Sequence, residues 1–232
     1  MIVYGKNVIR EAAFANRKFH ALYVDEKFND AYFLKFLADK GVRFTRVNKE
    51  KLNQLSKHAT HQGLVADVED YQYSELASFL DTAGRKRFMI LDGVEDPHNL
   101  GAILRTAEAT KLTAIIISKK NQVPLNATVA KVSSGAIEHV PIVLVSNINQ
   151  TIKTLKDHHI WVIGTDGNTD QSFYDIPKDQ STAIILGNEG SGIRPLVKEN
   201  CDYLVKIPMY GKINSLNVSV AAALMMYQML DE

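Results

Sequence analysis

Three stretches of the sequence combine hydrogen-bonding or charged side chains with glycine or proline. They span residues 91–109, 185–195 and 207–219. Each follows a short apolar run that we interpret as a strand. In an open parallel sheet, ligands bind just beyond the carboxyl ends of the strands, so the polar groups of all three stretches are expected at one edge. The sequence offers no Ser-His-Asp order, no metal-ligand cluster and no close pair of carboxylates that would favour another chemistry.

The first two stretches supply an amide, a guanidinium and a carboxylate. Asn99 is well placed to cap a helix over Leu100–Thr110, and capping alone would explain it. Arg105 could pair with Glu108 one turn on, or hold a phosphate through its planar fork. The second stretch reads I-L-G-N-E-G-S-G-I-R-P and is neither a P-loop nor a dinucleotide fingerprint. Its Glu189 lies among three glycines, where a tight turn needs no carboxylate.

The third stretch contains more polar side chains than a helix cap requires. It leads into an almost wholly apolar segment, Val218–Leu230, which predicts a helix buried on most sides. One Asn or Ser would cap that helix, yet four such residues occur within six positions. Because a helix N-terminus attracts anions and carbonyl-rich ligands, the surplus fits either generous capping or the wall of a ligand site. The four residues are Asn214, Ser215, Asn217 and Ser219.

Short continuous apolar runs separated by helical segments predict an α/β fold with a parallel sheet covered on both faces. Helices are expected at Leu100–Thr110, Ala127–Ser134 and the C-terminal segment. The predicted strands are Phe88–Leu91, Ala114–Ser118, Pro141–Val145, Ile160–Gly164, Ala183–Gly187 and Leu204–Ile207.

The first seventy residues form a separate alternating pattern and predict a compact α/β domain over 1–70. A polar linker is expected over 71–87, followed by the second domain over 88–232. In the first domain, helices are predicted at Lys6–Ala15, Ala31–Ala38 and Lys49–Ser56, and strands at Phe19–Val24, Val42–Val47 and 64–68.

Composition narrows the class of protein. The chain has 232 residues, 46% of them hydrophobic and 23% charged, as in ordinary globular proteins. We expect no membrane span, because no apolar run is long enough, and no signal peptide, because the N-terminus has no basic region followed by an apolar run. The single cysteine, Cys201, excludes an internal disulfide and fits a reducing cytoplasm. Residues 1–70 carry twelve Lys and Arg against nine Asp and Glu, a charge of +3 that is compatible with a polyanionic partner.

Taken together, the three stretches resemble the three motifs of the SpoU branch of the SPOUT RNA 2′-O-ribose methyltransferases, in order and spacing. The N-terminal V-Y-G-K-N-V-I-R-E-A and H-Q-G-L-V-A also resemble an L30e-like substrate-binding domain. That pairing is typical of the subgroup that methylates a guanosine in the peptidyl-transferase region of bacterial 23S rRNA.

The resemblance implies S-adenosylmethionine as methyl donor, RNA as substrate, no metal, and a homodimer formed through the C-terminal domain. It also implies a deep trefoil knot through which the C-terminal segment is threaded, which periodicity cannot reveal. The implied catalytic residues are Asn99, Arg105, Glu189, Ser215 and Asn217. The implied cofactor-binding residues are Gly187, Ile207, Pro208, Leu216 and Asn217.

The family proposal makes the Arg105 equivalent the general base. Because guanidinium hardly ever loses its proton in proteins, our hypothesis is that Arg105 grips an adjacent phosphate and lowers the pKa of the ribose hydroxyl electrostatically. Two other functions stay open: a related enzyme acting on tRNA or on an rRNA adenosine, and a non-catalytic RNA-binding protein. Tyr210, Lys212 and Ile213 depart from the small residues that relatives often carry there, and Lys212 is a candidate RNA contact.

Overall fold

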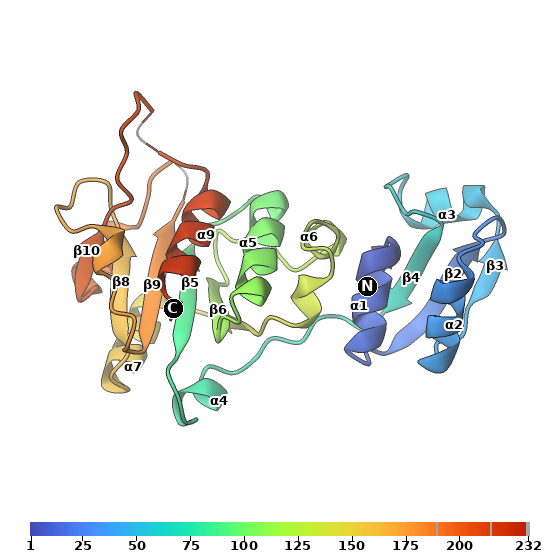
Figure 1. Ribbon diagram of the computed structural model, residues 1–232, viewed down its shortest axis with the longest axis horizontal. Coiled ribbons are helices and arrows are strands. Elements are labelled where there is room, and N and C mark those ends of the chain that lie inside the picture. Colours follow the sequence, from blue (N-terminus) through green and yellow to red (C-terminus); the bar gives the residue numbers. More distant parts are fainter. Residues whose placement is uncertain (189, 214, 231–232) are drawn as a thin grey trace. The chain divides into compact units, whose positions relative to one another are not determined.

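The computed structural model describes residues 1–188, 190–213 and 215–230 (Figure 1). Backbone contacts divide the chain into two compact units. The first comprises residues 1–72 and 124–139, and the second residues 73–123 and 140–232. The domain boundaries expected from the sequence stay a prediction, because a division by contacts does not test which parts fold independently.

The first unit is built on a four-stranded sheet in the order β1-β4-β2-β3. Strand β4 runs antiparallel to both its neighbours, whereas β2 and β3 are parallel. Its elements are β1 (Ile2–Tyr4), α1 (Lys6–Phe14), β2 (Phe19–Asp25), α2 (Ala31–Asp39), β3 (Thr45–Val47), α3 (Lys49–Leu55), β4 (Leu64–Val68), α6 (Ala127–Val132) and the 3₁₀ turn η1 (Ala136–Glu138). The predicted strand Val42–Val47 is wrong in its first half, since only its last three residues pair with β2.

The segment 124–139 belongs to this unit although it lies between two strands of the other sheet in sequence. Helix α6 contacts β1 and α1, and η1 contacts α1. A buried ion pair joins Arg17 to Glu138 at 2.8 Å, with 7% and 5% of the side chains exposed. Tyr71 donates a hydrogen bond to the same carboxylate at 2.9 Å, and the Arg17 guanidinium lies over the Tyr71 ring.

The second unit contains a six-stranded sheet in the order β10-β8-β9-β5-β6-β7, with every pair parallel. The predicted α/β fold with a parallel sheet is confirmed. Its strands are β5 (Arg87–Asp92), β6 (Ala114–Ser118), β7 (Ile142–Val145), β8 (Trp161–Thr165), β9 (Thr182–Gly187) and β10 (Tyr203–Val205). Its helices are α4 (Ala77–Leu80), α5 (Pro97–Ala109), α7 (Ile148–Asp157), the 3₁₀ turn η2 (Phe173–Asp175), α8 (Pro195–Asn200) and α9 (Val218–Gln228).

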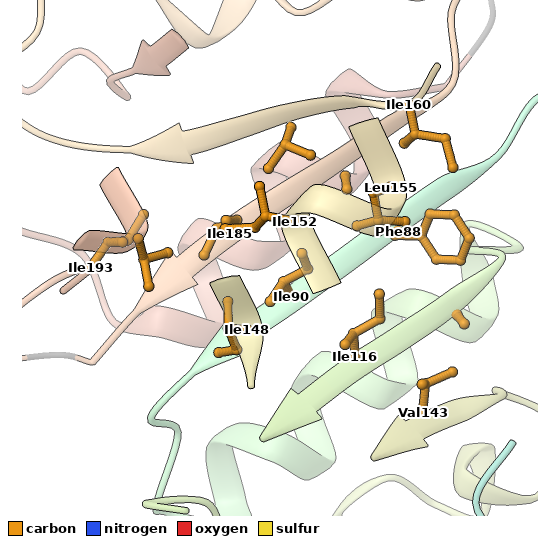
Figure 2. Close-up of a cluster of buried hydrophobic side chains, with 14 residues drawn as sticks. Phe88, Ile90, Ile116, Val143, Ile148, Ile152, Leu155, Ile160, Ile185 and Ile193 are labelled. Carbon is orange, nitrogen blue, oxygen red and sulfur yellow. The ribbon is translucent and has the colours of Figure 1, made fainter. Parts of the chain in front are cut away.

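One face of this sheet packs against α7 and α8 (Figure 2). Phe88 and Ile90 of β5 and Ile185 of β9 bury their side chains there against Ile152 and Leu155 of α7. Each such side chain contributes roughly 1.5–3 kcal/mol through the apolar area removed from water. This core fixes where the strands end, and therefore where the loops of the candidate site begin.

The other face carries α5 and α9, which lie side by side. Helix α5 begins at Pro97 with Asp96 as N-cap, so the predicted N-cap role of Asn99 is wrong. Asp96 accepts from the His98 N–H, and proline at the first helical position lacks the N–H that would need a partner. Asn99 is thereby placed inside the first turn.

Helix α9 is less buried than its composition predicts. Val218, Ala222, Met225 and Met226 are buried, but Val220, Leu224 and Tyr227 are 48%, 39% and 58% exposed. These three residues recur at a spacing of four and three, so they form one apolar stripe along the helix. The expectation of a helix buried on most sides therefore does not hold for this chain by itself.

Candidate active site and cofactor pocket

A cavity of about 620 Å³ opens at the carboxyl ends of β8, β9 and β10. Four of the predicted cofactor-contacting or catalytic residues line it, namely Ile207, Pro208, Ser215 and Leu216. Apolar walls come from Leu186 of β9, Val205 of β10 and Met225 of α9. The volume falls within the range of small-molecule sites, roughly 300–1,000 Å³.

Polar groups of the cavity come from the end of β8. Thr165 donates its hydroxyl to the Ile185 carbonyl at 3.0 Å, which holds β8 against β9. Asp166 follows and forms an ion pair of 2.7 Å with Lys198 of α8. The hydrogen bond from Lys198 lowers the pKa of the Asp166 carboxyl, so the cavity is lined by an ionised carboxylate.

Thr165 and Asp166 were missed by reasoning from the sequence. Both directly follow the apolar run I-W-V-I-G, at the sheet edge where ligand-binding groups gather. Their place after a predicted strand, between Gly164 and Gly167, was the available signal, but no recognised motif includes them.

Gly187 does not line the cavity, although the resemblance implied that its backbone cradles the cofactor. Strand β9 ends at Gly187, and the chain then folds back so that a Cβ on this residue would lie 2.0 Å from the Gly192 carbonyl carbon. No side chain fits there. The observed role of Gly187 is to let the following loop pack directly against the strand end.

Asn217 joins α9 to α5. Its side-chain Nδ2 donates to the side-chain Oδ1 of Asn99 at 3.0 Å, while its own Oδ1 accepts from the Ser219 backbone N–H at 2.9 Å. Asn217 is thus the N-cap of α9, which agrees with the expectation that an Asn or Ser caps this helix. Asn99 is only 8% exposed. The first and third stretches of the sequence therefore meet through these two side chains.

Arg105 lies on α5 two turns beyond the helix start and is exposed. Within residues 1–188, 190–213 and 215–230, its guanidinium has no hydrogen-bond or ion-pair partner, so the alternative pairing with Glu108 is not formed. An exposed guanidinium with five donors can bind an external phosphate. Glu189 and Asn214 lie outside the described residues.

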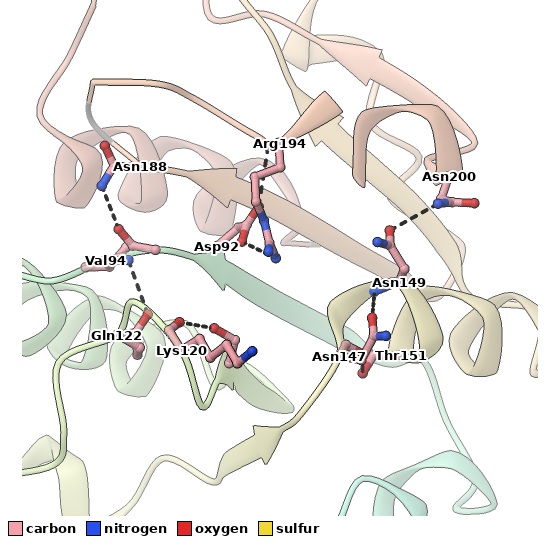
Figure 3. Close-up of polar contacts among 12 residues, drawn as sticks. Asp92, Val94, Lys120, Gln122, Asn147, Asn149, Thr151, Asn188, Arg194 and Asn200 are labelled. Atoms are coloured by element: carbon pink, nitrogen blue, oxygen red, sulfur yellow. Dashed lines mark hydrogen bonds and ion pairs between the residues drawn. The ribbon is translucent and has the colours of Figure 1, made fainter. Parts of the chain in front are cut away.

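The loop that follows β9 is closed by its own backbone. Asn188 and Gly192 exchange two hydrogen bonds of 3.2 and 2.9 Å. The Asn188 side chain accepts from the Gly190 N–H and donates to the Gly93 carbonyl at 3.0 Å (Figure 3). This last contact ties the loop to the turn that precedes α5. The second stretch therefore lies against the first.

The described part of the chain contains neither three potential metal ligands grouped together nor a helix long and apolar enough to cross a membrane. The polar groups that line the cavity include the hydroxyls of Thr165 and Ser215 and the Asp166 carboxylate, a donor and acceptor set suited to a nucleotide-like ligand. Asn99, Arg105 and Asn217 are not among its lining residues.

Two protein-family models match the chain. Residues 86–227 match the SpoU rRNA Methylase family, and residues 2–74 match the RNA 2′-O ribose methyltransferase substrate binding domain. The chain belongs to the SpoU family. Its three predicted motifs, which are joined by the hydrogen bonds from Asn217 to Asn99 and from Asn188 to Gly93, all fall within the first of these matches.

Curated relatives extend over almost the whole chain. A putative TrmH family tRNA/rRNA methyltransferase from Staphylococcus aureus strain MSSA476 is 42% identical, with 98% of this chain and 94% of the relative covered. The putative TrmH family tRNA/rRNA methyltransferase YacO from Bacillus subtilis is also 42% identical, over 97% and 93%. Both names leave the choice between tRNA and rRNA open.

Solved structures of SpoU-type proteins share the fold. The SpoU methyltransferase AviRb from Streptomyces viridochromogenes, solved in complex with AdoMet, has a TM-score of 0.83 at 23% identity, covering 99% of this chain and 88% of that chain. A putative RNA methyltransferase of the TrmH family from Porphyromonas gingivalis has a TM-score of 0.81 at 24% identity, over 99% and 88%. At these identities the likeness establishes the fold.

Proposed function

We propose that this SpoU-family RNA methyltransferase transfers a methyl group from S-adenosylmethionine to the ribose 2′-hydroxyl of a guanosine in 23S rRNA, in the peptidyl-transferase region. The observation that carries the reaction type is the hydrogen bond between Asn217 and Asn99 beside a cavity lined by Ser215 and Leu216. It unites the first and third motifs at one sheet edge.

The cavity fits S-adenosylmethionine by size and lining. Its apolar walls suit a heterocyclic ring, and the Asp166 carboxylate suits hydroxyl or cationic groups. Ile207, Pro208 and Leu216 would hold this ligand, and Gly187 would shape the adjoining loop rather than contact it. When bound, the sulfonium supplies a methyl group that is already a good electrophile. The chain then has to position the ribose hydroxyl in line and help remove its proton.

Arg105 is proposed to hold the phosphate next to the target ribose. Its exposure on α5 and its lack of a partner among the described residues support a contact with RNA. A guanidinium there would stabilise the developing alkoxide, and the proton would pass to solvent or to the phosphate. Glu189, Ser215 and Asn217 are proposed to orient Arg105, the cofactor and the ribose.

A homodimer through the C-terminal domain is part of the proposal. The stripe formed by Val220, Leu224 and Tyr227 is unusually apolar for a solvated surface and would be buried by a second copy. The deep trefoil knot and a cytoplasmic location stay proposals as well. Elution at the 25.9 kDa monomer mass at micromolar concentration would contradict the dimer.

Two alternatives remain, and one experiment separates them. The purified protein is incubated with methyl-labelled S-adenosylmethionine and either 23S rRNA fragments or tRNA. Label in a guanosine of the 23S fragments supports the proposal. Label in tRNA or in an rRNA adenosine identifies a related methyltransferase, and no label in any RNA favours a non-catalytic RNA-binding protein.

A further inference from the structure

The ion pair between Asp92 and Arg194 connects the end of β5 to the loop that follows β9. Asp92 is the last residue of β5, and the turn after it leads to α5 with Asn99 and Arg105. Arg194 ends the loop that follows β9 and precedes α8. In the β5–β9 ladder Asp92 is the direct partner of Gly187. The pair therefore lies just where the two strands end.

The contact has the geometry of a two-pronged grip (Figure 3). Arg194 Nη2 lies 2.8 Å from Asp92 Oδ1, and Nε donates to Oδ2 at 3.0 Å. The Arg194 backbone N–H lies 3.5 Å from the same Oδ2. A planar guanidinium that engages both oxygens of a carboxylate fixes orientation as well as distance, which an ammonium group does not.

Burial shows that this pair differs from an ordinary surface ion pair. Only 5% of the Asp92 side chain is exposed, against 57% of Arg194. A carboxylate that is removed from water needs a partner, and here the partner comes from the opposite loop. Because Asp92 is anchored in the centre of the sheet, it gives the Arg194 loop a rigid attachment point.

A second contact joins the loop that follows β9 to the turn that follows β5. The Asn188 side chain donates to the Gly93 backbone carbonyl at 3.0 Å, so the first and last residues of the stretch 188–194 are bonded to Gly93 and Asp92, respectively. Within this loop, two backbone hydrogen bonds join Asn188 to Gly192. Glu189, a proposed site residue, is next to Asn188 in the sequence.

We propose that Arg194 and Asp92 are positioning residues, which fix the second motif's loop in register with the first motif for methyl transfer. This inference rests on the proposed function. Of the described residues 188–194, none lines the cofactor cavity. Breaking the Asp92–Arg194 ion pair should therefore slow the methyl-transfer step and leave the affinity for S-adenosylmethionine nearly unchanged.

The test compares Arg194→Gln, Arg194→Lys, Asp92→Asn and the double variant Asp92→Asn/Arg194→Gln. We expect kcat to fall at least about tenfold in Arg194→Gln, with KM for S-adenosylmethionine within about twofold, because small misplacements of a site are costly to the reacting step. Arg194→Lys should restore only part of kcat. The double variant should lose no more than the worse single variant, since the two residues act as one unit.

A matched control is Lys156→Gln, which breaks an ion pair of 2.8 Å with Asp202 away from both loops. It should leave kcat unchanged. Hydrogen exchange gives a readout independent of activity. The Gly192 amide, bonded to the Asn188 carbonyl at 2.9 Å, should exchange faster in Arg194→Gln and in Asp92→Asn, but not in the control.

Unchanged kcat in folded Arg194→Gln would overturn the inference, as would a parallel loss of kcat and cofactor affinity. Unchanged exchange at Gly192 would overturn it too. If the wild type transfers no methyl group to any RNA, the proposed function fails. Faster exchange of the Gly192 amide in the variants would then still show that the Asp92–Arg194 ion pair holds this loop in place. Failure of the proposed function and failure of this inference are therefore distinguishable.

Discussion

The Asn217 side-chain amide donates a hydrogen bond of 3.0 Å to the side-chain oxygen Oδ1 of Asn99, a residue 118 positions earlier in the chain. The side-chain oxygen of Asn217 also caps the N-terminus of α9, because it accepts from the Ser219 backbone N–H. One side chain thus performs a local task, capping the start of a helix, and a long-range task, joining two motifs. The two tasks can be separated by substitution.

Asn217→Ser should keep the cap and lose the bond to Asn99, since serine is a good N-cap with a shorter side chain. We expect a loss of about 1 kcal/mol in the free energy of unfolding and a much larger effect on methyl transfer, about tenfold or more. Asn217→Ala should lose about 2 kcal/mol because the cap goes as well. Urea unfolding and initial rates measure the two effects.

The control is Asn147→Ala, which removes the cap of α7. It should cost about 1 kcal/mol of stability and leave the rate of the folded enzyme intact. If Asn217→Ser transfers methyl at the wild-type rate, the link between the two motifs has no part in the reaction.

Arg105→Lys tests the role of the guanidinium. Lysine keeps the charge but cannot grip a phosphate with two prongs, so we expect kcat/KM to fall roughly a hundredfold while KM for S-adenosylmethionine is unchanged. Steady-state kinetics with varied RNA and varied cofactor separate the two parameters. Retention of most activity would exclude both the bidentate grip and a special arginine base.

Glu138→Gln should destabilise the first unit by about 3 kcal/mol, because the buried Arg17 guanidinium loses its counter-charge. Hydrogen exchange of the β2 and β4 amides reports unfolding of this unit. The matched control Glu26→Gln changes an exposed side chain of the same unit and should cost less than about 0.5 kcal/mol. Equal effects of the two substitutions would show that the buried pair contributes nothing.

Cys201 should react slowly with iodoacetamide at neutral pH. Burial raises the pKa of its thiol to about 11, and only the thiolate is nucleophilic. Relative to an ordinary thiol of pKa 9.0, this lowers the thiolate fraction at pH 7.5 roughly a hundredfold. The alkylation rate should rise about tenfold per pH unit towards pH 11. Rapid alkylation of the native protein at pH 7.5 would contradict this.

Much of the second unit could be predicted because its strands are continuous apolar runs. Such runs require cover on both faces, and the helical segments between them favour a parallel sheet with helices on each side. The position of Asn99 was misjudged by local reasoning. Asp96 and Pro97 together make a stronger helix start than Asn99, and the helix begins two residues before it.

The sequence pattern could not predict which distant segments of the chain pack against each other. The spacing of apolar residues in Ala127–Ser134 predicts a helix, but it does not say that α6 packs against β1 rather than on the large sheet. The hydrogen bond from Asn217 to Asn99 likewise depends on where α5 and α9 pack. The exposed stripe of α9 could not be predicted for a related reason, since an apolar composition does not distinguish a buried helix face from an exposed one.

The most direct test of the central claim is the position of the transferred methyl group. RNA is methylated with labelled S-adenosylmethionine and hydrolysed in alkali, which cannot cleave the bond after a 2′-O-methylated nucleotide. The account predicts label in alkali-resistant dinucleotides, reduced strongly in Arg105→Lys and less strongly in Asn217→Ser. Label in mononucleotides, as from a methylated base, would contradict it.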